Sequence, residues 1–149
     1  MSTPSAQRLQ IGQLLVQLTR LFQTELFERL VAAGLTEARA PHMHVTAYIK
    51  PEGSRLTELA AQARMTLPAM SELVDDLQRL RIVERRPDPR DKRAKLICLT
   101  DAGWKAMRTG RSTIDDIEAD YARRVGPERF EAAAQTLDEL LRSLTTDVD

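Results

Sequence analysis

Cysteine is nearly absent from the sequence, with Cys98 as its single occurrence in 149 residues. A lone thiol cannot form a disulfide within the chain, which argues against a secreted disulfide scaffold and favours a reducing compartment. The polar segment 1–10 lacks the apolar core of a signal peptide, and no later apolar run is long enough to span a bilayer. We therefore expect a soluble, cytoplasmic protein with an inert thiol.

The usual motifs of catalysis are missing as well. The sequence contains no Gly-rich phosphate loop, no cysteine and histidine cluster with metal-ligand spacing, and no nucleophile motif. His42 and His44 lie two positions apart, which places them on different faces of a helix and makes a shared metal ion unfavourable. We expect neither an enzyme nor a bound metal or other cofactor.

Net charge is also absent, because 22 Lys and Arg residues balance 22 Asp and Glu residues. The distribution is uneven, since residues 79–95 hold eight basic residues against three acidic ones, and the rest of the chain is correspondingly acidic. Any attraction for phosphate is therefore confined to one surface. The basic residues of this segment are Arg79, Arg81, Arg85, Arg86, Arg90, Lys92, Arg93 and Lys95.

Helical periodicity covers most of the chain, whose length suits one domain. Gly34 is expected to end the first helix, and Pro41 lies in the first turn of the second. Thr66 is expected to cap the fourth helix, with Pro68 in its first turn. The expected helices cover residues 9–35, 37–49, 56–65 and 66–77, and two more follow Thr100.

Two short segments with β-branched and charged residues, 82–86 and 95–99, predict the strands of a hairpin. The connection 87–93 contains Pro87 and Pro89, so we expect a projecting basic loop and not a tight two-residue turn. Two helices joined by a tight turn can place the second in the major groove, which is about 12 Å wide. A helix pair alone is a weak signal, but a basic hairpin directly after it favours DNA binding.

The hairpin resembles the wing of the MarR family of winged helix-turn-helix regulators. The resemblance rests on Val83-Glu84-Arg85, on Asp88-Pro89-Arg90-Asp91-Lys92-Arg93-Ala94, and on Leu99-Thr100 with Gly103. It implies a mainly α fold with a small β wing, acting as a homodimer on a near-palindromic operator in double-stranded DNA. It further implies a repressor that a small aromatic or phenolic effector releases. We expect one MarR-like domain over 1–149, with a DNA-binding lobe at 54–100 and dimerisation helices at 6–34 and 110–147.

The resemblance and the residue pattern together assign candidate sites. Candidates for DNA binding on the fourth helix are Thr66, Pro68, Ala69, Ser71, Glu72 and Asp75, and those on the hairpin are Arg85, Arg86, Arg90, Lys92, Arg93 and Lys95. Asp88 and Asp91 are expected to stabilise the wing, with Arg90 at its tip. The effector is expected to contact Arg39, His42, His44 and Tyr48.

The sequence departs from the family pattern in two ways. Glu72 and Asp76 stand where many relatives have basic or neutral polar residues, so acids facing phosphate would weaken non-specific binding. Arg81 replaces the glycine that usually precedes the hairpin, which could strain that turn. An alternative function remains open, in which the chain is a helical protein-interaction module whose basic hairpin binds an acidic partner.

Overall fold

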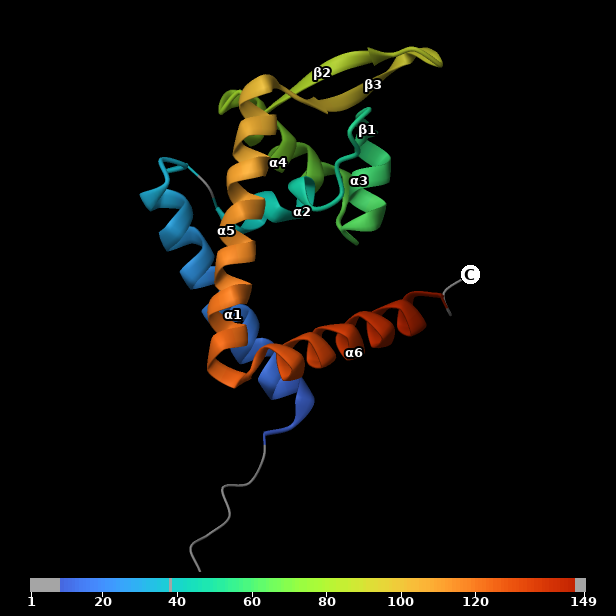
Figure 1. The fold of residues 1–149 in the computed structure, drawn as a ribbon. Helices are drawn as coiled ribbons and strands as arrows, with labels where there is room; N and C mark the ends of the chain where they lie inside the picture. Colours follow the sequence, from blue (N-terminus) through green and yellow to red (C-terminus); the bar gives the residue numbers. More distant parts are fainter. Residues whose placement is uncertain (1–8, 38, 147–149) are drawn as a thin grey trace, which may run out of the picture. The chain divides into compact units, whose positions relative to one another are not determined.

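The computed structural model describes residues 9–37 and 39–146, so residues 6–8 and 147 of the expected dimerisation helices lie outside the described residues. The expectation of a mainly helical fold with a small sheet is confirmed (Figure 1). The chain forms two compact units that divide after Arg111. The elements are α1 (Ile11–Ala32), η1 (Ala40–His42), α2 (Met43–Thr46), β1 (Ser54–Arg55), α3 (Leu56–Gln62), α4 (Leu67–Arg79), β2 (Val83–Asp88), β3 (Asp91–Leu99), α5 (Asp101–Val125) and α6 (Pro127–Thr146).

The second helix is shorter than the predicted span 37–49. It begins with the 3-10 turn η1 after the extended residue Arg39, continues as α2, and ends at Thr46. The proline at position 41 suits a helix start because it has no backbone N–H to leave unpaired. Pro51 disfavours helical backbone at Lys50, so the chain has to leave the helix before that residue.

The core of the first unit lies between α2, α3, α4 and the sheet. Met70, Val74 and Leu77 face it from α4, whereas Leu73 is only half-buried at its edge. Each large apolar side chain so buried contributes about 1.5–3 kcal/mol. The buried cluster consists of Val45, Leu59, Ala60, Met70, Val74, Leu77, Val83, Ile97 and Leu99.

The ends of α4 follow local rules. The Thr66 hydroxyl accepts a hydrogen bond from the Ala69 backbone N–H (3.4 Å), which confirms the predicted N-cap. At the other end Arg81 has a positive φ of 58°, and the Ile82 N–H bonds back to the Leu77 carbonyl oxygen. This is a Schellman ending, in which the left-handed position normally favours glycine. The suspected strain at Arg81 is therefore present in the backbone.

The sheet has three strands in the order β1-β3-β2, all antiparallel. Sequence reasoning found β2 and β3 but missed β1, whose two residues pair with Leu96 and Ile97. The expectation of a long projecting loop was wrong. The strands continue until Asp88 pairs with Asp91, which leaves Pro89 and Arg90 as a two-residue turn. The side-chain contacts of Asp88 supply the reason and are described below.

Cys98 is buried in β3, where Gly53 packs against it. A Cβ atom at position 53 would lie 2.6 Å from the Cys98 sulfur, and the φ of +99° at Gly53 also favours glycine. Burial raises the pKa of the Cys98 thiol, which keeps it protonated and favours an inert role. Within the described residues, no helix is both long and apolar enough to cross a membrane.

Candidate nucleic-acid interface

Helices α3 and α4, with the turn between them, form the expected helix-turn-helix unit. One face of α4 is open to solvent and presents Pro68, Glu72, Asp75 and Arg79, which follow one another at intervals of three or four residues. Ala69 and Ser71 are half-buried beside this face, and Thr66 is exposed at its start. The predicted reading residues therefore lie on or next to the solvent-facing side of α4.

Asp75 of α4 forms an ion pair with Arg85 of β2, with 2.7 Å between Oδ1 and Nη2. The Arg85 guanidinium also donates to the side-chain oxygen of Gln78. Together with Arg79 these residues line an open hollow of about 320 Å³. Two side chains predicted to bind DNA thus pair with each other, and the pair joins the wing to α4.

Asp76 points away from the open face of α4, and its side chain is only 17% exposed. It pairs with Arg39, which precedes η1, and with Arg79 on its own helix. His42 Nε2 lies 3.2 Å from Asp76 Oδ2, the oxygen with which Arg39 also pairs. The expectation of a free acid facing phosphate is therefore wrong for Asp76, because neighbouring cations neutralise it.

The imidazole of His42 is buried inside this group of charges. Burial lowers the pKa of His42, and the positive charge of Arg39 lowers it further, so the ring is neutral at pH 7. A neutral ring that carries its proton on Nε2 donates to Asp76. The contact ties η1 to α4 across 34 residues of sequence.

The wing is held by Asp88, whose side chain is fully buried. Its carboxylate accepts hydrogen bonds from Arg55 Nε (2.9 Å), Arg55 Nη2 (2.7 Å) and the Arg90 backbone N–H (2.9 Å). The backbone bond from Arg90 and the side-chain bonds from Arg55 lower the pKa of Asp88. These contacts close the turn at Pro89 and Arg90, which is why no long loop projects.

Arg55 was missed by sequence reasoning. Its partner Asp88 lies 33 residues further along the chain, and no local sequence pattern indicates that a residue of a two-residue strand forms this ion pair. Arg55 also lies outside residues 79–95, the segment in which basic residues are concentrated. Asp91, the other predicted wing residue, accepts the Arg93 backbone N–H at 3.0 Å.

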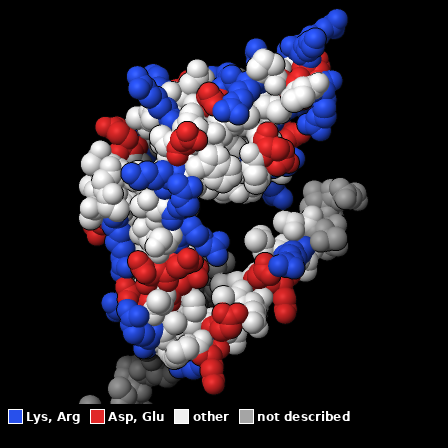
Figure 2. All heavy atoms as spheres, turned by 45° about the horizontal axis from the view of Figure 1, so that its top comes forward, with Lys and Arg blue, Asp and Glu red and all other residues white. Residues whose placement is uncertain are grey.

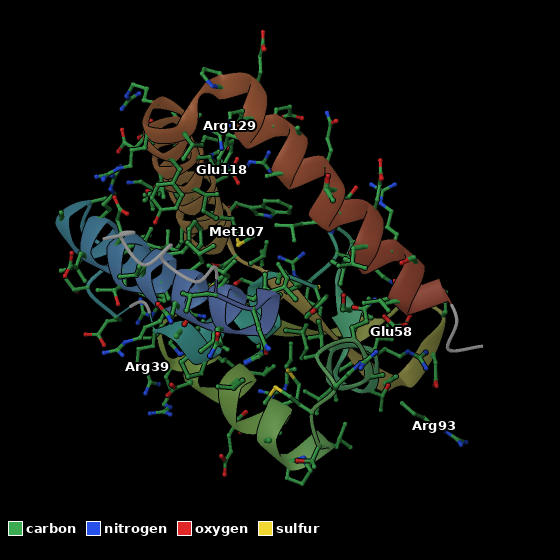
Figure 3. The ribbon with its side chains drawn as sticks, turned by 90° about the horizontal axis from the view of Figure 1, so that it is seen from below. Arg39, Glu58, Arg93, Met107, Glu118 and Arg129 are labelled. Atoms are coloured by element: carbon green, nitrogen blue, oxygen red, sulfur yellow. The ribbon has the colours of Figure 1, made fainter. Side chains whose placement is uncertain are left out.

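The remaining basic residues of the wing differ in their surroundings. Arg86 is bonded to Glu84 (Nε–Oε1 2.9 Å), and this bond raises the pKa of Arg86. Lys92, Arg93 and Lys95 are exposed and form no ion pair within residues 9–37 and 39–146. Blue atoms accordingly cover the outer end of the wing in Figure 2, and Arg93 projects from that end in Figure 3.

Two of the four residues expected at an effector site are neighbours, since Arg39 Nη2 and His42 Nε2 lie 3.4 Å apart. The side chains of the other two, His44 and Tyr48, are exposed. No cluster of three or more potential metal ligands is found in the part of the chain that the structure describes.

A helix-turn-helix unit followed by a basic two-stranded wing defines the winged helix-turn-helix class of proteins. Within this class, the model of the MarR family matches residues 33–94. Over this segment the chain is therefore similar to the MarR family.

Similar proteins extend over most of the chain. An uncharacterised HTH-type transcriptional regulator, YdcH of Bacillus subtilis, is 27% identical over 129 residues, which are 85% of this chain and 88% of YdcH. The crystal structure of a MepR–DNA complex from Staphylococcus aureus has a TM-score of 0.71 at 22% identity and covers 91% of this chain and 99% of MepR. A mutant of MarR from E. coli has a TM-score of 0.72 at 21% identity, with coverage of 91% and 98%.

Proposed function

We propose that the protein is a transcriptional regulator that binds double-stranded DNA through α4 and the wing. The observation that carries this proposal is the distribution of charge on the wing. The buried carboxylate of Asp88 binds Arg55 and the wing turn, whereas Lys92, Arg93 and Lys95 are exposed at the end of the wing, which lies next to a helix with one open face. The MepR–DNA complex supports the proposal, because that protein of similar fold binds DNA.

The proposal includes a homodimer with dimerisation helices at 6–34 and 110–147, spans that contain α1, the end of α5 and α6. Helices α1 and α6 both expose large apolar side chains to solvent, with exposed fractions between 41% and 72% for the residues concerned. Such leucine-rich faces favour a covering partner, and a second copy supplies two matching faces by two-fold symmetry. The side chains are Leu15, Val16, Leu18, Leu21 and Val31 on α1 and Leu137, Leu140, Leu141 and Leu144 on α6.

Sedimentation at micromolar concentration tests the dimer. Leu141→Glu is expected to shift the protein toward monomer, whereas Glu139→Gln on the same helix is the control and should leave the dimer intact. A wild-type protein that sediments as a stable, folded monomer would contradict the proposal.

Footprinting on the DNA that flanks the protein's own gene tests operator binding. A two-fold dimer predicts protected half-sites about 34–36 Å apart, or a multiple of that distance. Binding to duplex DNA and to an acidic protein should be compared at graded salt. Preference for the acidic protein would favour the alternative, a protein-interaction module.

We further propose that the protein is a repressor released by a small aromatic or phenolic effector near η1 and α2. Support comes from the contact of Arg39 and His42 with Asp76, since a ligand that displaced either residue would act directly on α4. A coupling free energy of about 1–3 kcal/mol between effector binding and operator binding would change operator affinity about five- to 150-fold. A broad compound screen that leaves operator affinity unchanged would contradict this proposal.

A further inference from the structure

Helices α3 and α4 both end at an arginine with left-handed backbone. Arg64 has φ 52° and Arg81 has φ 58°, and within the described residues they are the non-glycine positions with positive φ. Each helix closes with the same pair of backbone bonds, Arg64 N–H to Ala61 and Met65 N–H to Ala60 after α3, and the equivalent pair after α4. Helix α1 ends in the same way with a glycine, Gly34, which adopts this conformation at low cost.

Arginine at such a position is strained, because its Cβ crowds the backbone where glycine has none. A strained residue in an otherwise regular turn is a reason to look for a role of its side chain. The side chains of both arginines are exposed, and neither forms an ion pair within the described part of the chain. Both guanidinium groups are therefore available to a partner.

Arg64 and Arg81 differ in the charged residues that surround them in the sequence. Between Arg55 and Arg79 the sequence contains Arg64 as its one basic residue, against the acids Glu58, Glu72, Asp75 and Asp76. Arg81 instead follows the C-terminal end of α4, and it is not among the residues expected to bind DNA. A phosphate contact made by a positively charged side chain of the turn of the helix-turn-helix unit therefore has to come from Arg64.

The position of Arg64 suits that contact. In helix-turn-helix proteins the first helix crosses the DNA backbone and the N-terminal residues of the second helix meet the bases. Arg64 lies in the turn that joins these two helices, at the N-terminal end of α4. Arg81 follows the C-terminal end of this 13-residue helix, roughly 20 Å away at 1.5 Å per residue.

We propose that Arg64 binds a backbone phosphate of the DNA duplex and that the protein retains arginine at this strained position for that contact. The inference rests on the proposed function. Arg81 has the same residue type, the same backbone conformation and the same helix ending, but it lies at the end of α4 away from the bases. It is therefore the matched control.

The experiment compares Arg64→Gly with Arg81→Gly in the full chain, with mixed-sequence duplex DNA as the probe. Both substitutions relieve the same strain, so the Tm of each variant should stay level or rise by about 2–4 °C. Arg64→Gly should in addition lower the slope of log affinity against log salt concentration by about 0.9 per protomer. That slope change is about eightfold in affinity per tenfold change in salt. Arg81→Gly should keep the wild-type slope.

A second variant, Arg64→Asn, removes the charge with a side chain that tolerates left-handed backbone, and it should repeat the loss of slope. A gain in stability together with a loss of affinity is not what a purely structural residue produces. Equal slopes for Arg64→Gly and Arg81→Gly, with the wild type binding, would overturn this inference alone. A wild type that binds no duplex at any salt concentration would overturn the proposed function and this inference with it.

Discussion

The wing and helix α4 distribute their charges in opposite ways. In α4 the acids Asp75 and Asp76 are paired with arginines that come from β2, from the segment before η1 and from α4 itself. In the wing a single buried acid, Asp88, binds Arg55 and the turn, and the outer basic residues are left exposed. Ion pairs thus neutralise Asp75 and Asp76 of α4, whereas in the wing the outer basic residues have no acidic partner among the described residues.

On the proposed function, this difference predicts different roles for the two regions. A wing with unneutralised lysines and arginines supplies attraction that does not depend on base sequence. The charged residues around α4 are mostly paired, so α4 supplies little net attraction for phosphate. We expect its open face to discriminate between base pairs. Four predictions test this division, and they follow in order of decreasing expected effect.

Asp88→Asn should have the largest effect, because it removes the carboxylate that holds both Arg55 and the wing turn. We expect duplex affinity to fall by at least about tenfold and the Tm to fall as well. The pKa of Asp88 is lowered in the folded state, so its stabilising effect is present above the ordinary carboxyl pKa and is lost as pH falls through the lowered value. Thermal denaturation should therefore show a difference from wild type that shrinks on acidification.

The control for Asp88 is Asp91→Asn, which alters an exposed acid of the same turn. It should have a smaller effect on both Tm and affinity. A Tm difference between Asp88→Asn and wild type that is constant from neutral to acid pH would show that the ionised carboxylate is not the stabilising species.

Arg90→Ala should weaken binding to all duplexes alike, since a guanidinium at the wing tip meets phosphate or minor-groove potential and reads little sequence. If the contact is to phosphate, the slope of log affinity against log salt should fall by about one per half-site. Titrations at several salt concentrations measure both quantities, with Arg129→Ala in α6 as the control. Unchanged affinity and slope would remove Arg90 from the interface.

Ser71→Ala and Glu72→Ala should change preference more than affinity, because both residues lie on or beside the open face of α4. We expect relative affinities among operator variants to shift by about 1–3 kcal/mol at contacted base pairs. A panel of single-base operator variants measures the shift, and Gln62→Ala on α3 is the control. If the ranking of the panel is unchanged, α4 does not read the bases through these side chains.

Glu84→Gln should have the smallest effect, and in the opposite direction. It removes the acid bonded to Arg86, so the guanidinium becomes available to phosphate and duplex affinity should rise slightly, by about two- to threefold. Binding at low salt is the sensitive measurement, and Glu58→Gln, whose partner Lys50 lies outside the wing, is the control. Weaker binding would mean that Glu84 is needed to orient Arg86.

Most of the fold was predictable, because it depends on signals that are local in sequence. The periodicity of α4, the cap at Thr66 and the stop at Gly34 each act within a few residues. The span of the second helix and the form of the wing turn were mispredicted for a related reason. There, local composition leaves several conformations open, and contacts from elsewhere in the chain select one of them.

The candidate site was predictable only in part. Its basic character follows from charge counts, and the open face of α4 follows from helical spacing. The pairing of these charges does not follow from such signals, since Asp75 and Arg85 are ten residues apart, and Arg39 precedes η1 whereas Asp76 lies on α4. The strain at Arg81 was expected from its position, whereas the equivalent strain at Arg64 had no such signal and appears only in the backbone angles.

By itself the sequence determined the order of the helices, the hairpin and the concentration of positive charge near it, because side-chain periodicity and charge are properties of neighbouring residues. Only the tertiary structure decided that Arg55 closes the wing and that Asp76 faces inward. Both outcomes depend on ion pairs between residues that are more than thirty positions apart in sequence. Such pairs form only after the elements that carry them have packed, so the choice between paired and free charge is made in the folded state.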